Sequence, residues 1–76
     1  MTLAELRVGS HGQVITVGGE NILRRRLLEM GITPRTIVTV KKIAPMGDPI
    51  ELFLRGYSLS LRKIDAENIT VAEVTE

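Results

Sequence analysis

The sequence contains no cysteine and no tryptophan, and its aromatic side chains are limited to Phe53 and Tyr57. Without cysteine, the chain has no disulfide framework, no thiolate metal site and no cysteine nucleophile. A small domain that folds without disulfides suits a reducing compartment such as the cytoplasm. Two rings are too few for an aromatic groove that binds proline-rich peptides, or for a platform on which nucleic-acid bases stack.

Charge of one sign and long apolar runs are also missing. Ten basic residues face nine acidic ones, so the net charge is +1, whereas nucleic-acid domains usually carry a strong basic surplus. The opening stretch MTLAELRVG lacks the basic start and apolar core of a signal peptide. No apolar run approaches the roughly 20 residues of a membrane-spanning helix. We therefore expect a cytoplasmic protein that does not insert into a membrane. Nucleic acid is not expected as a partner, although the charge balance leaves room for a local basic patch.

The remaining composition is that of a folded domain. The 76 residues are 43% hydrophobic and 25% charged, which is typical of a globular protein and argues against disorder. A chain of this length buries only about 60% of its unfolded surface, so its margin of stability is small. We expect a single domain that spans residues 1–76.

Helical spacing marks the stretch ILRRRLLEM. On a helical wheel, Leu23, Leu27 and Met30 fall on one stripe, which predicts a helix with one buried face. Gly31 suits the position after the last turn, and Pro34 prevents the helix from resuming. A capped helical turn is predicted at residues 2–6, because a threonine and a glutamate stand three residues apart there.

Alternating hydrophobicity marks the rest of the chain as strands. We predict strands at residues 13–17, 36–43, 50–55, 57–62 and 69–74, turns at 8–12 and 65–68, and a loop at 44–49. Five strands this short bury their apolar faces best by curling into a barrel, and closure removes exposed edges. The expected fold is mostly β, a small five-stranded SH3-like barrel with one helix between its first two strands and short helical turns.

Three consecutive arginines, Arg24, Arg25 and Arg26, lie in the predicted helix. Successive residues are about 100° apart on a helix, so these side chains fan around the cylinder and form no continuous basic stripe. The plainest interpretation is a solvated helix surface. A partner-binding surface is the second interpretation, since arginine is favoured at interfaces. Contact with nucleic acid is the third, and the fan geometry works against a phosphate track.

The loop between the second and third strands is the second candidate site. Pro45 and Pro49 stiffen it, which lowers the entropy cost of presenting its tip to a partner. Met46 and Gly47 form that tip, and methionine is an adaptable apolar contact. The competing interpretation folds Met46 back onto the barrel. Tyr57 is amphipathic, and it either borders the same surface or caps the core.

The sequence shows no recognisable catalytic or metal-binding set. The single histidine, His11, falls in a predicted turn and has no acid beside it in sequence. Asp48 and Glu51 are three residues apart and Asp65 and Glu67 are two apart, spacings that fit turns and surfaces better than ligand clusters. We expect no enzyme activity, no cofactor and no built metal site, while weak metal contact through His11 or Asp48 stays open.

Three stretches together resemble the FeoA family, ferrous iron transport protein A. They are LRRRLLEMGITP, APMGDPIEL and RGYSLSLRKIDAENITV, and with the leading GSHGQVITVGG they follow the family's order over nearly the whole chain. One departure is visible, since the family usually has glycine after the TP pair and this chain has Arg35. A glycine would permit a positive φ there, so Arg35 indicates either a turn without that need or a mildly strained one.

The resemblance implies an SH3-like barrel and a cytoplasmic accessory role beside FeoB, the ferrous iron transporter of the membrane with its cytosolic GTPase domain. A related barrel ends metal-dependent transcriptional regulators, but this chain has no room for their helix-turn-helix, so we expect a stand-alone domain. The leading hypothesis is an interaction module that docks on the cytosolic portion of the transporter. The alternatives are a small nucleic-acid-binding barrel and a weak transition-metal sensor.

Overall fold

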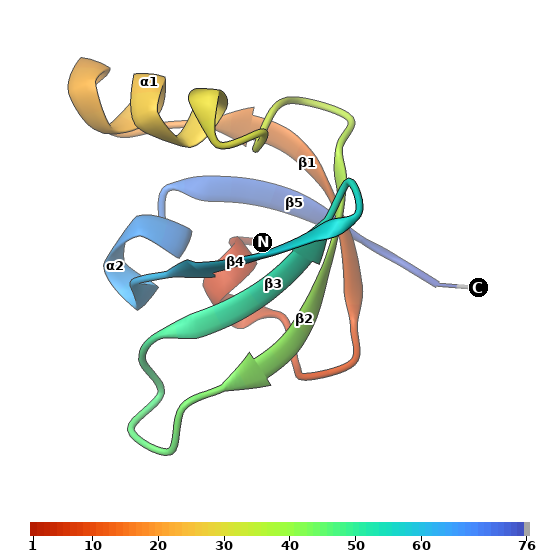
Figure 1. The fold of residues 1–76 in the computed structure, drawn as a ribbon. Helices are drawn as coiled ribbons and strands as arrows, with labels where there is room; N and C mark the ends of the chain where they lie inside the picture. The colour runs from red at the N-terminus through yellow and green to blue at the C-terminus, as the bar shows by residue number, and fades with distance from the viewer. Residues whose placement is uncertain (76) are drawn as a thin grey trace.

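A computed structural model of the chain describes residues 1–75 and shows a small mostly-β domain (Figure 1). The elements in chain order are a 3-10 turn η1 (Leu3–Glu5), β1 (His11–Val17), α1 (Asn21–Glu29), β2 (Ile37–Ile43), β3 (Ile50–Leu54), β4 (Tyr57–Leu61), α2 (Lys63–Ala66) and β5 (Ile69–Val74). The mostly-β class, with one main helix between the first two strands, is therefore confirmed.

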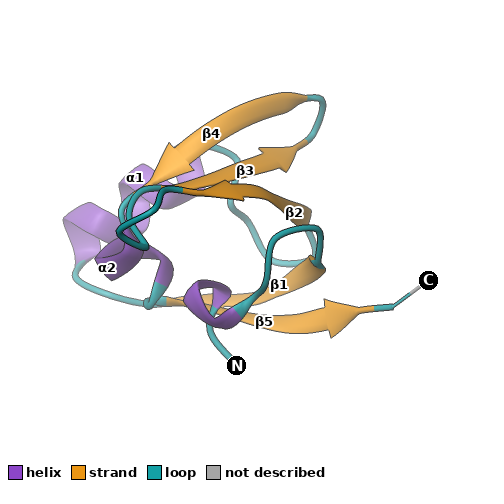
Figure 2. Cartoon of the chain, turned by 90° about the horizontal axis from the view of Figure 1, so that it is seen from below, coloured by secondary structure: helices purple, strands orange, loops and turns teal. Residues whose placement is uncertain are grey.

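The five strands form one antiparallel sheet in the order β4-β3-β2-β1-β5, which curls around the interior (Figure 2). The pairing departs from a sheet closed throughout by hydrogen bonds, because β4 and β5 remain its two margins. The N-terminal segment covers part of the β5 margin, where Thr2 bridges Thr70 and the Val71 N–H donates to the Met1 carbonyl at 2.9 Å. Among the strands of the described residues, β4 at the opposite margin pairs with β3 alone.

One apolar core fills the curl of the sheet. The inward residues of the strands meet Leu27 of α1 and Leu3 of the 3-10 turn, both fully buried. Leu23 and Met30, predicted to share the buried stripe with Leu27, pack against this core while partly exposed. Alternation along β3 buries Ile50, Leu52 and Leu54, as predicted from its period of two.

Two helix boundaries follow from short-range chemistry. At the end of α1, the N–H groups of Gly31 and Ile32 donate to the carbonyls of Leu28 and Leu27, each at 3.0 Å. With Gly31 at φ 99°, this is the Schellman stop that the sequence predicts. At the start of the chain, the Thr2 N–H donates to Glu5 Oε1 at 2.6 Å, which confirms the capping pair.

Two predicted turns were wrong in extent. His11 and Gly12 belong to β1, because both pair with residues of β2 and β5. A Cβ at Gly12 would sit 2.8 Å from the Leu6 side chain. Glycine at position 12 allows the Leu6 side chain to pack closely against the strand, although the residues around it in sequence have the composition of a turn. Near the end of the chain, a helical turn, α2, begins at Lys63, two residues before the predicted turn, and it buries Asp65.

Arg35 occupies the left-handed region, with φ 77°. The turn after α1 therefore uses a positive φ, and the strained one of the two alternatives for Arg35 is correct. The Arg35 N–H donates to the Val14 carbonyl at 2.7 Å, which holds the backbone in this conformation.

Candidate functional site

Both helices and the loop between β2 and β3 lie along one side of the molecule, with α1 at the top of Figure 1, α2 in the middle and the loop at the bottom (Figures 1 and 2). This side exposes apolar and arginine side chains, which are common in protein interfaces. We call this surface the helical face and define it by the exposed residues Ile22, Arg25 and Arg26 of α1, Ile64 of α2 and Met46 of the loop. Partner binding through an arginine helix and a methionine loop was predicted, and the fold places these elements on one side of the molecule with α2 between them.

The three arginines of α1 divide into two roles. Arg24 turns back toward the sheet, and its Nε donates to the backbone carbonyl of Val17 at 3.0 Å. This bond satisfies the last carbonyl of β1, so Arg24 is occupied within the fold. Arg25 and Arg26 are exposed and make no hydrogen bond or ion pair to another residue within 1–75. The predicted arginine surface is therefore reduced to Arg25 and Arg26.

The apolar side chains on the helical face were missed by the sequence analysis. Ile22 is 77% exposed, and Arg25 and Arg26 follow it one turn later on the same side of α1. Its position about 100° from Leu23 on the helical wheel was the signal that places it off the buried stripe. Ile64 is 62% exposed on α2, and the short length of that helix hides any such pattern.

The β2–β3 loop presents Met46 at its tip, 92% exposed. This contradicts the interpretation in which Met46 folds back onto the barrel. The loop is closed at its base, where the Ala44 N–H donates to the Pro49 carbonyl at 3.1 Å, and its tip is held in a turn by the Gly47 N–H, which donates to the Ala44 carbonyl at 2.7 Å. Pro45 is exposed beside Met46, so Pro45, Met46 and Gly47 form a pinned, outward-facing tip.

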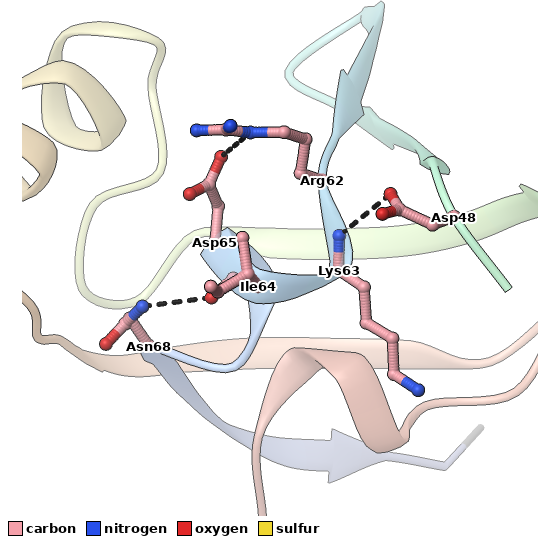
Figure 3. A network of polar contacts seen from close by, with 6 residues as sticks. All are labelled: Asp48, Arg62, Lys63, Ile64, Asp65 and Asn68. Carbon is pink, nitrogen blue, oxygen red and sulfur yellow. Dashed lines mark hydrogen bonds and ion pairs between the residues drawn. The ribbon is translucent and has the colours of Figure 1, made fainter.

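A polar network joins this loop to α2 (Figure 3). Asp48 Oδ1 accepts a hydrogen bond from the Lys63 N–H at 3.0 Å, which satisfies the first N–H of α2 from outside the helix. Asp65 is buried and lies 3.3 Å from Arg62 Nε, and Asn68 Nδ2 donates to the Ile64 carbonyl at 3.0 Å. Asp48 and Asp65 therefore hold the position of the loop and of α2, a role that their spacing in sequence did not indicate.

A shallow hollow of about 370 Å³ lies between the start of α1 and α2. Its walls combine two apolar side chains with charged and polar groups at the rim, and it is lined by Gly19, Glu20, Leu23, Arg62, Ile64, Asp65 and Asn68. Gly19, at φ 93°, keeps the floor open, because a Cβ there would meet Leu23 at 3.1 Å. The hollow is large enough for one apolar side chain of a partner.

Tyr57 lies apart from the loop tip. It begins β4 at the far end of β3, about 13–17 Å from the β2–β3 loop by the rise of a five-residue strand. Its hydroxyl donates to the Met30 carbonyl and so satisfies a carbonyl at the end of α1. Tyr57 therefore supports α1, and it does not border the surface formed by Met46.

The residues considered as metal ligands are also placed apart. His11 begins β1, where its Nδ1 is within hydrogen-bond distance of Thr39 Oγ1, 2.7 Å away. Across residues 1–75, no three His, Asp or Glu side chains come together in a group that could hold a metal ion. Within the same range, no helix has the length and apolar character needed to span a bilayer.

Comparisons with known proteins agree on one protein family. The family model of the FeoA domain matches residues 1–73. A curated relative from Porphyromonas gingivalis, an Fe(2+) transport protein A/Fe(2+) transporter FeoB fusion protein, is 38% identical over 71 residues. These residues are 93% of this chain, and the chain spans 8% of the length of that fusion protein.

Solved structures share the fold. An FeoA-like protein from Clostridium acetobutylicum is 45% identical and superimposes with a TM-score of 0.92, covering 100% of this chain and 88% of its own. FeoA of Stenotrophomonas maltophilia, a prokaryotic SH3-domain protein complexed with zinc, is 26% identical with a TM-score of 0.83, covering 95% and 89%. The SH3-like architecture expected from the strand pattern is thereby confirmed.

Proposed function

This chain belongs to the FeoA domain family of ferrous iron transport, and we propose that it acts there as a non-catalytic interaction module. It docks on the cytosolic portion of a FeoB-type ferrous iron transporter and supports or regulates uptake. The module works in the cytoplasm, needs no cofactor of its own, and leaves the passage of Fe²⁺ to the transporter.

The observation that carries this proposal is the fusion in Porphyromonas gingivalis. There, a segment 38% identical to this chain is part of the same polypeptide as FeoB. A covalent link holds a domain near its partner at an effective concentration in the millimolar range. Whether or not it is joined to the transporter, a domain that acts on it needs a surface complementary to it.

The helical face has the composition for such a surface. Ile22, Met46 and Ile64 offer apolar side chains that are largely exposed to solvent. Arg25 and Arg26 add guanidinium groups that pair with carboxylates in two-pronged fashion. Pro45 and Gly47 shape the pinned tip that carries Met46, so the loop loses little entropy when it is bound.

Docking acts on the transporter by shifting its equilibrium between states. A bound domain favours whichever conformation or nucleotide state it binds more tightly, and only that difference in affinity changes the populations. The Stenotrophomonas FeoA is described as a candidate activating factor for ferrous iron transport. We extend that role to this chain, with FeoB as the protein whose states it shifts.

Co-elution with the detergent-solubilised transporter of the same organism tests the proposal. The chain is applied with the transporter to a size-exclusion column, without nucleotide and with GDP or a non-hydrolysable GTP analogue. We expect stable co-elution in at least one nucleotide state. An Arg25→Ala/Arg26→Ala variant and a Met46→Asp variant should stay folded and lose co-elution.

Arg24 is left unchanged in these variants because its bond to Val17 belongs to the fold. Arg7→Ala serves as a matched control, since it removes an exposed positive charge that lies outside the helical face. Absence of co-elution in every nucleotide state would contradict the proposed function. Co-elution that survives both variants would leave docking in place and refute the helical face as its surface.

A further inference from the structure

The strand β4 forms one margin of the sheet, and its outer edge is exposed. β4 (Tyr57–Leu61) pairs with β3 in an unbroken register of five residue pairs, and within residues 1–75 no strand lies on its other side. We call this other side the β4 edge. Figure 2 shows it at one extreme of the curled sheet, while the N-terminal segment lies beside the opposite margin.

The hairpin geometry shows which backbone groups the β4 edge presents. Arg55 and Gly56 form a two-residue turn in which both have positive φ, 48° and 85°. Such a turn closes on a hydrogen-bonded pair, here Leu54 with Tyr57, and bonded pairs then alternate along an antiparallel ladder. The N–H and C=O groups of Ser58 and Ser60 therefore point away from β3, and neither residue makes a backbone bond elsewhere within residues 1–75.

The usual protections of an edge strand are absent from β4. Proteins guard exposed edges with charged residues, proline, bulges or a covering segment. β4 has the sequence YSLSL, without charge or proline, and its register with β3 contains no bulge. The β5 margin, by contrast, is covered by Met1 and Thr2 at its start and carries the charge of Glu73 further on. An unprotected edge of this kind is a template for strand addition.

The charges beside β4 select the kind of strand that can be added. No acidic residue occurs between Leu52 and Ile64. Arg55, whose Nη2 also donates to the hydroxyls of Thr33 and Thr36, precedes the strand, while Arg62 and Lys63 follow it. The Arg62 side chain is 66% exposed although it pairs with Asp65. Glu51, the cross-strand neighbour of Ser60, faces Lys42 on β2. A positive charge thus stands at each end of the edge.

The same charges disfavour a second copy of the chain as the occupant. If two β4 strands paired antiparallel with Ser58 opposite Ser60, Arg55 of one copy would face Lys63 of the other. Like charges directly opposite in a sheet are destabilising, whereas carboxylates at those positions would be attracted. The occupant that fits is an extended, acidic segment of another protein.

We infer that the β4 edge is the docking site for an extended acidic segment of the transporter, which adds as a sixth strand beside Ser58 and Ser60. This inference rests on the proposed function for the source of the segment. Main-chain hydrogen bonds to the two serines give the contact its affinity, and the flanking basic residues choose an acidic sequence. The helical face is a separate surface, so the two contacts can be tested separately.

Backbone and charge variants test the inference against the intact transporter. Ser58→Pro and Ser60→Pro each delete one outward N–H while leaving the pairing with β3 in place. Each should weaken binding at least tenfold. Glu73→Pro is the matched control, because it deletes an outward N–H from the β5 margin instead, and Ser58→Ala and Ser60→Ala should bind as the unchanged chain does.

A second pair of variants keeps every backbone group. Ser58→Glu/Ser60→Glu should weaken binding by repelling the acidic strand, whereas Ser58→Lys/Ser60→Lys should bind as tightly as the unchanged chain or more tightly. Hydrogen exchange supplies a direct readout, since the Ser58 and Ser60 amides should exchange at least tenfold more slowly once the transporter is added.

The outcomes separate this inference from the proposed function. If the unchanged chain binds the transporter but folded proline variants bind equally well and the serine amides stay unprotected, the β4 edge is not the contact and docking stands. If the glutamate variants bind more tightly than the lysine variants, the acidic segment is refuted. If the serine amides are already protected in a dimer of the chain alone, a second copy is the occupant. If nothing binds, the proposed function and this inference both fail.

Discussion

Arg24 donates a hydrogen bond from its Nε to the backbone carbonyl of Val17 at 3.0 Å, across the junction between β1 and α1. One arginine of three in succession is thus built into the fold, while Arg25 and Arg26 face outward. The same residue type in one helical turn serves stability at one position and is available for recognition at the next two.

This division predicts different effects on stability. Arg24→Ala should lower the free energy of unfolding by about 1 kcal/mol, because the Val17 carbonyl loses a charge-assisted hydrogen bond. Arg25→Ala should leave it unchanged within a few tenths of a kcal/mol, as for most exposed positions. Urea unfolding followed by circular dichroism measures both. An equal loss in the two variants would show that the bond to Val17 contributes nothing.

Backbone strain at Arg35 predicts a stabilising substitution. Arg35 has φ 77°, a region that costs a residue with a Cβ about 1 kcal/mol or more. Arg35→Gly should therefore raise the free energy of unfolding by about 0.5 kcal/mol, since relief of strain outweighs the added entropy of the unfolded chain. Thermal unfolding monitored by calorimetry would show a higher Tm.

Arg55 provides the contrast for that measurement. It also has a positive φ, 48°, but its Nη2 donates to the hydroxyls of Thr33 and Thr36, each at 2.9 Å. Arg55→Gly loses these bonds along with the strain, so its Tm should not rise. A higher Tm in Arg55→Gly than in Arg35→Gly would mean that backbone strain alone governs both sites.

The contact between Asp48 and Lys63 predicts a coupling between the loop and α2. Asp48→Ala should destabilise the domain by about 1 kcal/mol, because the first N–H of α2 loses its acceptor. The amide of Lys63 should exchange with solvent faster. Asp48→Asn keeps a side-chain oxygen in place and should recover most of the lost stability. An Asn variant as unstable as the Ala variant would show that the charge of Asp48, and not its hydrogen bond, stabilises the domain.

The capping pair at the N-terminus predicts a pH dependence. The backbone N–H of Thr2 donates to the Glu5 carboxylate and lowers its pKa below the usual range. A carboxyl whose pKa is lowered in the folded state stabilises the fold at pH values above its unfolded pKa, and this contribution is lost as the pH falls through the lowered pKa. Glu5→Gln should lower the Tm at neutral pH and flatten its fall in acid. If the Tm of Glu5→Gln falls in acid as steeply as that of the unchanged chain, Glu5 is not a cause of the acid sensitivity.

Local chemistry made much of this fold predictable. The period of α1, its stop at Gly31 and the alternation in β3 are set by neighbours in sequence, and the structure reproduces them. Gly12 was wrongly predicted to lie in a turn, because its role depends on Leu6 and Val71, which the fold brings against it. A glycine beside Ser10 and His11 has the composition of a turn, and only tertiary packing shows that it belongs in a strand.

The residues that the candidate site exposes could largely be predicted from the sequence, but the contacts between its elements could not. Arg25, Arg26 and Met46 lie on the surface as a helix and a loop tip should present them. The commitment of Arg24 to Val17 and of Asp48 to Lys63 joins residues from different elements, so spacing in the sequence carries no sign of either. The open margin at β4 depends on strand order, which a list of strands does not specify.

The most direct test of the account is the affinity of the chain for the detergent-solubilised FeoB-type transporter, measured by interferometry with the transporter immobilised. We predict saturable binding in at least one nucleotide state, weakened at least tenfold by Arg25→Ala/Arg26→Ala and unchanged by Arg7→Ala. Because exposed charges contribute, the affinity should also fall as salt rises. A folded chain that shows no saturable binding in any nucleotide state would contradict the central claim that this domain works by docking on the transporter.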